Sequence, residues 1–169
     1  MNELISKISS YNIFNFLFPG ALFAVLADKL TRLSLLQEDM LIGAFVYYFI
    51  GLVISRFGSL VIEPVLKNIK FLEFSDYRDY ISASERDQKI ELCLEVSNTY
   101  RTITSMFIIL GLVMAYLEFE SKLHWLEQNR IHLLIMALLV MFAFSYRKQS
   151  VYLSKRVEAN KHDKSKINK

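Results

Sequence analysis

Charged side chains divide the chain into four uncharged segments and the polar stretches between them. The uncharged segments are residues 8–27, 40–55, 102–117 and 131–146. The last two are apolar on every face when they are drawn as helices, whereas an amphipathic helix of a soluble bundle must show a polar face to water. The pattern therefore favours helices in a lipid bilayer over the alternative, a soluble helical bundle with an unusually apolar core.

The lengths of these segments agree with membrane crossing once their flanks are included. A hydrocarbon core of about 30 Å takes about 20 helical residues, and three of the segments hold 16. Each is flanked by long cations whose aliphatic stems can lie among acyl chains while the guanidinium reaches the headgroups; these are Arg56, Arg101, Arg130 and Arg147. The mean hydropathy of +0.29 supports the same interpretation.

We therefore expect an all-α, polytopic membrane protein with about four transmembrane helices and a small helical cytoplasmic part, in a single domain over residues 1–169. Residues 1–66 are assigned to the first two transmembrane helices with a cytoplasmic extension, and 67–101 to a cytoplasmic helical segment. Residues 102–146 are assigned to the third and fourth transmembrane helices, and 147–169 to a basic cytoplasmic tail.

The positions of the cations predict the orientation. Lys and Arg are retained in the cytoplasm, and 15 of the 20 lie in the N-terminal stub, the central segment and the tail. The two alternate loops hold only four, namely Lys29, Arg32, Lys122 and Arg130. This distribution predicts a multi-pass protein with both termini in the cytoplasm, and it places Trp125 in an outer loop at headgroup depth.

Polar and helix-breaking residues stand inside the first apolar segment. Pro19-Gly20 lies near its centre, so we expect a kinked or broken helix, serving either as a packing kink or as a hinge beside a water-filled cavity. The amides of Asn12 and Asn15 would be costly in lipid, which predicts hydrogen bonds to a neighbouring helix or subunit.

Small residues recur one turn apart in the second and third segments. Gly51-x-x-x-Ser55 and Gly111-x-x-x-Ala115 allow helix backbones to approach closely, within the chain or between copies. They predict helix association without indicating the oligomeric state.

The apolar pattern continues past the second segment, so its helix is expected to extend into the cytoplasm. Arg56 and Glu63 are two turns apart on one face. Arg56 is expected at the headgroups and Glu63 in water, or both could line an aqueous path between subunits. The sequence Ser84-Glu85-Arg86-Asp87 predicts a helix cap with Ser84 as the acceptor, followed by a helix that could run into the third segment.

Residues for catalysis or metal binding are scarce. Cys93 is the only cysteine, and His124, His132 and His162 lack the close spacing of a zinc site. No phosphate-binding glycine loop or nucleophile motif is present in the sequence. We expect no cofactor, and the chain does not resemble a conventional enzyme.

Arg156 and His162 form one motif of interest in the basic tail. An arginine followed by a histidine after four to six residues is the spacing of HEPN ribonucleases, in which the histidine can transfer protons and the arginine can stabilise phosphate charge. The residues alone favour the other interpretation, a solvated cationic tail that meets anionic lipid headgroups or RNA.

The small size, several apolar segments, the N-terminal YNIFNFLFPGALF and the R-x5-H of Arg156 and His162 together resemble the membrane accessory proteins of type VI-B CRISPR systems. The resemblance implies a homo-oligomeric ring, octameric as one option, in the bacterial inner membrane, which enhances RNA-guided antiphage defence by forming a pore. It also implies that Arg156 and His162 are a divergent HEPN-like pair, with an RNA-guided RNA nuclease or RNA as partner.

Four short helices are too few to enclose a channel, so a pore would need a ring of copies. Asn12, Asn15 and Arg56 are the candidates to line such a pore or an interface. The hypotheses that remain are a membrane-permeabilising defence effector, a membrane-tethered HEPN-like ribonuclease, and a non-enzymatic scaffold for a cytoplasmic partner.

Overall fold

The structure is a computed structural model that describes residue 11 and residues 13–167, apart from the side chains of residues 78, 85 and 160–167. This part of the chain consists of helices and short loops, without a strand. Its elements are η1 (Ile13–Leu17), α2 (Phe18–Leu30), α3 (Met40–Phe57), η2 (Gly58–Ile62), α4 (Glu63–Asn68), α5 (Tyr77–Arg86), α6 (Lys89–Glu120) and α7 (His124–Ile167), where η1 and η2 are π-helical turns.

Four helices are long and apolar enough to cross a membrane, in agreement with the all-α prediction. They are Ile13–Leu30, Met40–Asn68, Lys89–Glu120 and His124–Ala159. With 32 and 44 residues, α6 and α7 exceed the length that a bilayer core requires. Residues 147–167 of the predicted basic tail are a helical continuation of the fourth apolar segment, within α7.

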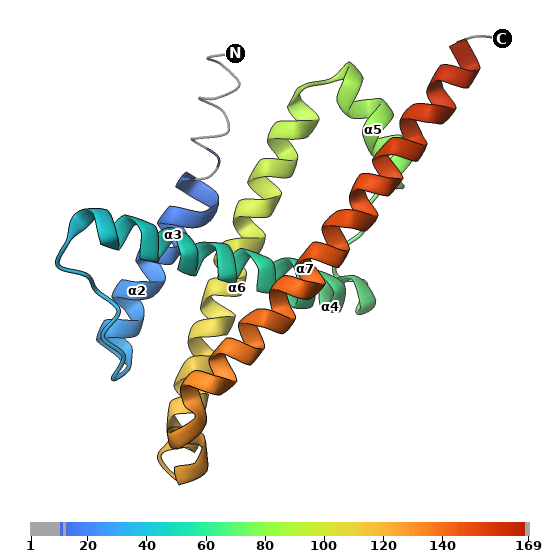
Figure 1. Cartoon of the computed structure of the whole chain (residues 1–169). Helices are drawn as coiled ribbons and strands as arrows, with labels where there is room; N and C mark the ends of the chain where they lie inside the picture. Colours follow the sequence, from blue (N-terminus) through green and yellow to red (C-terminus); the bar gives the residue numbers. More distant parts are fainter. Residues whose placement is uncertain (1–10, 12, 168–169) are drawn as a thin grey trace.

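The helices do not form a parallel bundle. Residues 121–123 join α6 and α7 into a hairpin whose arms diverge away from this turn (Figure 1). The continuous helix formed by α3, η2 and α4 crosses both arms, and η2 contacts each of them. We call the part of the hairpin from its middle, where η2 and α4 cross it, to α5 its open end.

The buried core is small and belongs to three helices. Phe23 and Ala27 of α2, Ile54 of α3, and Met106 and Leu110 of α6 form one cluster. Because crossing helices touch only over a patch, the size of the side chains at the crossing decides how closely they pack. Most of α7 lies outside this core.

Glycines set the distance between the first two long helices. A Cβ added at Gly20 would overlap the carbonyl oxygen of Tyr47, and one added at Gly51 would overlap that of Phe16. The close approach of helix backbones predicted at Gly51 and Ser55 therefore occurs between helices of one protomer, and Ser55 is buried there. Gly111 has no neighbouring atom within 4 Å of such a Cβ, so its small size is not used inside the chain.

Both prolines follow a π-helical turn, and of the two forms expected for the first helix, kinked or broken, the break does not occur. Pro19 follows η1 and Pro64 follows η2, and in both places the chain remains helical. A proline removes one backbone donor and its ring clashes with the carbonyl four residues earlier. A wider turn with bonds over five residues relieves that clash, as the bond from the Glu63 N–H to the Gly58 carbonyl illustrates.

The start of α6 differs from its predicted cap. Ser84 lies inside α5, where its hydroxyl donates to the carbonyl of Ile81 over 2.9 Å, so its assignment as the acceptor is wrong. The cap position is Gln88, whose side chain makes no capping bond, and the carboxylate of Asp87 one residue earlier accepts from the backbone N–H of Lys89 at 2.9 Å. From there α6 runs without interruption into the third apolar segment.

Candidate functional site

A buried hydroxyl network joins three elements near the middle of the molecule. The Thr102 hydroxyl of α6 lies 2.9 Å from Oδ1 of Asn15 in η1 and 3.3 Å from Oγ of Ser55 in α3. Asn15 is 1% exposed, and Thr102 is fully buried. The predicted hydrogen bond from Asn15 to a neighbouring helix is confirmed, and it places this amide inside the protomer. Asn12 lies outside the described residues.

Glu63 is buried at the open end and surrounded by cations. Its carboxylate lies 2.7 Å from Nη1 of Arg101, 3.1 Å from Nζ of Lys67 and 3.7 Å from Nζ of Lys148. Only 7% of Glu63 is exposed. The expectation that Glu63 sits in water is therefore wrong, because it is buried and forms an ion pair with Arg101 between α4 and α6.

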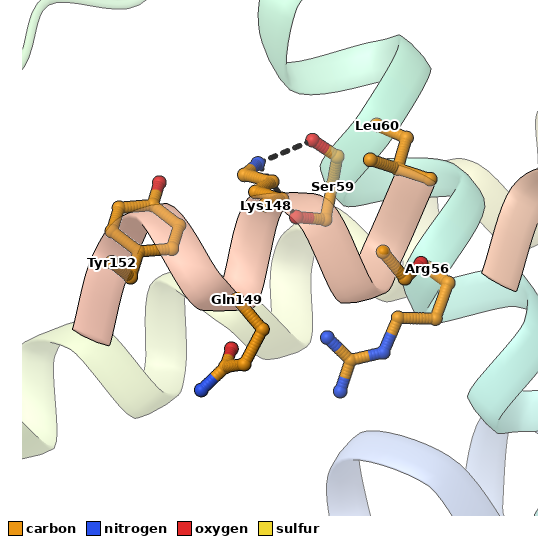
Figure 2. Close-up of a pocket in the computed structure, with 7 residues that line it drawn as sticks. Arg56, Ser59, Leu60, Lys148, Gln149 and Tyr152 are labelled. Atoms are coloured by element: carbon orange, nitrogen blue, oxygen red, sulfur yellow. Dashed lines mark hydrogen bonds between the residues drawn. The ribbon is translucent and has the colours of Figure 1, made fainter. Parts of the chain in front are cut away.

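The π-helical turn η2 explains how Lys148 is held. In a π-helical turn each N–H bonds to the carbonyl five residues earlier, as Glu63 does to Gly58. The next such bond would join residue 64 to the Ser59 carbonyl, but Pro64 has no N–H. Lys148 of α7 supplies a donor instead, since its Nζ lies 2.6 Å from the Ser59 carbonyl and 2.8 Å from the Ser59 hydroxyl (Figure 2). A proline in one helix thereby creates a docking point for another.

Arg56 does not join the Glu63 cluster, although the two were expected on one face. The intervening π-helical turn changes the angular spacing between them. Among the described residues the Arg56 guanidinium forms no hydrogen bond or ion pair. It instead lines a small cavity of about 30 Å³ between the α3–η2 junction and α7. Figure 2 shows Arg56 and Gln149 on the side of α7 away from the Lys148–Ser59 contact.

The far end of the molecule has its own buried carboxylate. Glu120, at the last position of α6, is 3% exposed and lies 2.8 Å from Nη2 of Arg32. The same guanidinium donates to the carbonyl of Leu117 at 3.2 Å. This pair fastens the loop after α2 to the closed end of the hairpin, whereas the Glu63 cluster ties α4 to the middle of both arms.

Arg156 lies on the extension of α7 beside α5. The rings of Tyr77 and Tyr152, 6.1 Å apart, bring these helices together. Burial raises the pKa of Tyr80, the nearby Glu91 carboxylate adds to the rise, and the Arg156 guanidinium opposes it. The Arg156 guanidinium and the Glu91 carboxylate therefore each lie near the Tyr80 hydroxyl.

His162 is six positions after Arg156 on the same helix, and its side chain is outside the described part. Residues that share a helix face are three, four or seven apart. A single copy of α7 therefore presents the backbone positions of Arg156 and His162 on different faces.

The ion-pair cluster could not be found from sequence spacing. Glu63 is 38 residues from Arg101 and 85 from Lys148, and only the crossing of α3–η2–α4 with α6 and α7 brings them together. The sequence offers only a weak signal, because Glu63 is the first acidic residue after the apolar segment 40–55 and lies two turns beyond Arg56.

The described residues contain no group of three His, Cys, Asp or Glu that could hold a metal ion. The open end offers ammonium and guanidinium groups, hydroxyls and amides, which suit the binding of oxyanions.

The chain matches no family model, no curated protein and no solved structure.

Proposed function

We propose that this protein assembles as a homo-oligomer in the bacterial inner membrane and permeabilises or depolarises it, as an accessory to RNA-guided type VI-B CRISPR antiphage defence. The four apolar helices cross the bilayer, and the open end and both termini face the cytoplasm. The defence role rests on the sequence resemblance of the N-terminal segment and of Arg156 and His162. The assembly rests on the physical argument that follows.

The proposal that the protein assembles from several copies rests on the exposed apolar surface of α7. None of the residues in the most apolar stretch of the His124–Ala159 span is buried in the protomer. Exposed apolar side chains occur around the helix, among them Leu134 at 60%, Leu139 at 63% and Phe144 at 53%. Such a surface needs lipid, copies of the same chain, or both. A ring in which α7 packs on a neighbouring protomer would cover part of it.

A path for ions has to lie between copies. In the described part of one protomer the small, partly open cavity at Arg56 measures about 30 Å³. The larger hollow, near Arg32 and Met114, is a shallow depression between α2 and α6. Neither connects the two ends of the helices, so conduction would follow the axis of a closed ring.

A voltage-sensitive dye tests this function directly. Cells that carry the protein together with an activated RNA-guided nuclease should lose their membrane potential, and cells with either component alone should not. Arg156→Ala should weaken the loss if the cytoplasmic extension transmits the signal, whereas the neighbouring exposed Lys155→Ala should behave as wild type. An unchanged potential with the wild-type protein, present at normal levels in the membrane, would overturn the proposal.

A scaffold for a cytoplasmic partner is the second candidate, and one surface favours it. On the part of α6 before the third apolar segment, Leu92, Leu94 and Val96 are 60%, 40% and 44% exposed. If the dye experiment shows no loss but the nuclease co-purifies with the membrane fraction, the scaffold replaces the pore. RNA cleavage by the purified protein, abolished by His162→Ala, would instead identify a membrane-tethered ribonuclease.

A further inference from the structure

The small cavity at the open end combines cationic, hydroxyl and amide groups from two helices. It lies where the α3–η2 junction meets α7 (Figure 2). Its polar lining consists of Arg56, Ser59, Ser145, Lys148, Gln149 and Tyr152. No acidic side chain lines it, which distinguishes it from the Glu63 cluster next to it.

Two of the lining groups have no partner in the described part of the chain. Oγ of Ser145 is buried and makes no hydrogen bond. The Arg56 guanidinium forms neither a hydrogen bond nor an ion pair within that part. An unpaired buried hydroxyl costs stability, and a guanidinium can only donate. A ligand that satisfies both groups must therefore present acceptor oxygens.

The local charge favours an anionic ligand. Glu63 is shared among Arg101, Lys67 and Lys148, and Arg56 forms no ion pair among the described residues. Arg56 therefore adds a positive charge beside this cluster. Arginine binds carboxylate and phosphate oxygens through paired, charge-assisted hydrogen bonds.

The position along the helices indicates which anion is available. Arg56 directly follows the uncharged segment 40–55, and Ser145 lies in the last turn of 131–146. Both therefore belong at the boundary between hydrocarbon and headgroups, where phospholipid phosphates lie. The stacked rings of Phe49 and Phe142, 6.2 Å apart, continue the same α3–α7 contact toward the apolar side.

The size of the cavity also favours a lipid phosphate over a free polyanion. A water molecule needs about 10–15 Å³ of such volume, so a cavity of about 30 Å³ admits one or two oxygens and no bulkier group. A phosphodiester at the membrane surface can insert its non-bridging oxygens while its chains and headgroup remain outside. Basic pockets between helices on the cytoplasmic side are known binding places for anionic headgroups.

We propose that this cavity binds the phosphate of an anionic phospholipid, with Arg56 and Ser145 donating to its oxygens. The bound lipid links α3 to α7 at the open end, and in a ring it places Arg56 at the lipid-facing side rather than at the axis. The inference requires membrane insertion but holds whether or not the protein conducts ions.

Native mass spectrometry of the full-length protein in detergent, titrated with phosphatidylglycerol, tests this site. Wild-type protein should retain the lipid. Arg56→Gln should lower its affinity about tenfold, as expected for the loss of a charge-assisted bond, and Ser145→Ala should lower it less. Arg147→Gln is the matched control, because it removes the same charge from an exposed residue beside Lys148 that does not line the cavity.

Titrations with other phosphate-containing molecules test whether the ligand is a lipid, free phosphate or RNA. Phosphatidylcholine has the same phosphodiester but a cationic choline, so it should bind more weakly than phosphatidylglycerol and lose less affinity with Arg56→Gln. Inorganic phosphate and a short single-stranded RNA should bind more weakly than phosphatidylglycerol and without dependence on Arg56. Equal losses with Arg56→Gln and Arg147→Gln would mean diffuse attraction and overturn the site. Arg56-dependent binding of inorganic phosphate or RNA in preference to the lipid would overturn the assignment of the ligand. If Arg56→Gln fails to fold, Ser145→Ala against wild type decides the outcome.

Discussion

At the scale of single residues, the hydroxyl of Thr102 connects α6 with η1 and α3. It reaches Asn15 and Ser55 in a site from which water is excluded. We expect Thr102→Val to lower the free energy of unfolding by about 1–2 kcal/mol, because the buried polar groups of Asn15 and Ser55 then lose the hydroxyl they contact. Unfolding in mixed micelles with increasing dodecyl sulfate would measure the change.

Thr99→Val provides the control for this substitution. The Thr99 hydroxyl bonds only to the carbonyl of Glu95 within α6, at 3.0 Å. The same chemical change there should therefore have a smaller effect. Equal losses in the two variants would show that the network between helices contributes nothing beyond local helix stability.

Glu63 balances the cations of three helical segments, so its charge is expected to matter more than that of an exposed acid. Glu63→Gln keeps the shape but leaves Arg101 and Lys148 without a carboxylate. Removing one partner of a buried ion pair costs about 3 kcal/mol or more. We expect a loss of this size by the same unfolding measurement.

Glu118 offers the comparison for Glu63. It pairs with Lys122 at 3.5 Å on an exposed face, where both side chains are mostly in solvent. Such a pair contributes less than about 1 kcal/mol, so Glu118→Gln should be nearly neutral. A Glu63→Gln protein as stable as Glu118→Gln would contradict a structural role for the cluster.

These residues also show how far sequence reasoning reaches. The bonding of Asn15 to a neighbouring helix follows from the cost of an amide in an apolar segment, which is a property of one position. The pairing of Glu63 depends on residues 38 and 85 positions away. No local pattern contains that information.

At the scale of helices, the crossing of α2 and α3 depends on Gly20 and Gly51, because neither position has room for a side chain. Gly51→Ala would drive a methyl group into the Phe16 carbonyl and force the helices apart. Overpacking of this kind costs typically about 1–3 kcal/mol, and the obstacle here is backbone that cannot rotate away. We expect an effect at the upper end of that range, measured by unfolding in mixed micelles.

Gly111→Ala is the matched substitution in the third apolar segment. Nothing lies within 4 Å of the added atom inside the protomer, and alanine is the better helix former by about 1 kcal/mol. The protomer should be unchanged or slightly more stable. If Gly111→Ala destabilised an assembled form without affecting the monomer, Gly111 would lie at a contact between copies.

The helices themselves were predictable, whereas their irregular turns were not. Uncharged segments of 16 or more residues specify apolar helices because few other structures satisfy the backbone in lipid. The π-helical turns before Pro19 and Pro64 arise from how each helix packs around a missing donor. A proline in the sequence is equally compatible with a break, a kink or a widened turn.

At the scale of the whole molecule, the oblique path of α3 across the α6–α7 hairpin leaves α7 largely without partners (Figure 1). The number of apolar segments predicts how many helices there are but not how they cross, because crossing angles depend on which small residues meet. In this protein Gly20 and Gly51 meet in α2 and α3, and η2 inserts between the arms of the hairpin. The uncovered α7 is the consequence, and it motivates the proposed assembly.

The orientation of this arrangement can be tested with the native thiol. Cys93 is the only cysteine of the chain and lies exposed on α6, on the side of the apolar segment proposed to be cytoplasmic. A membrane-impermeant maleimide should label it in inverted membrane vesicles and leave it unmodified in intact spheroplasts. In a Cys93→Ser background, Ser121→Cys at the exposed turn between α6 and α7 should show the reverse pattern. Labelling of both positions from the same side would mean that α6 does not cross the membrane.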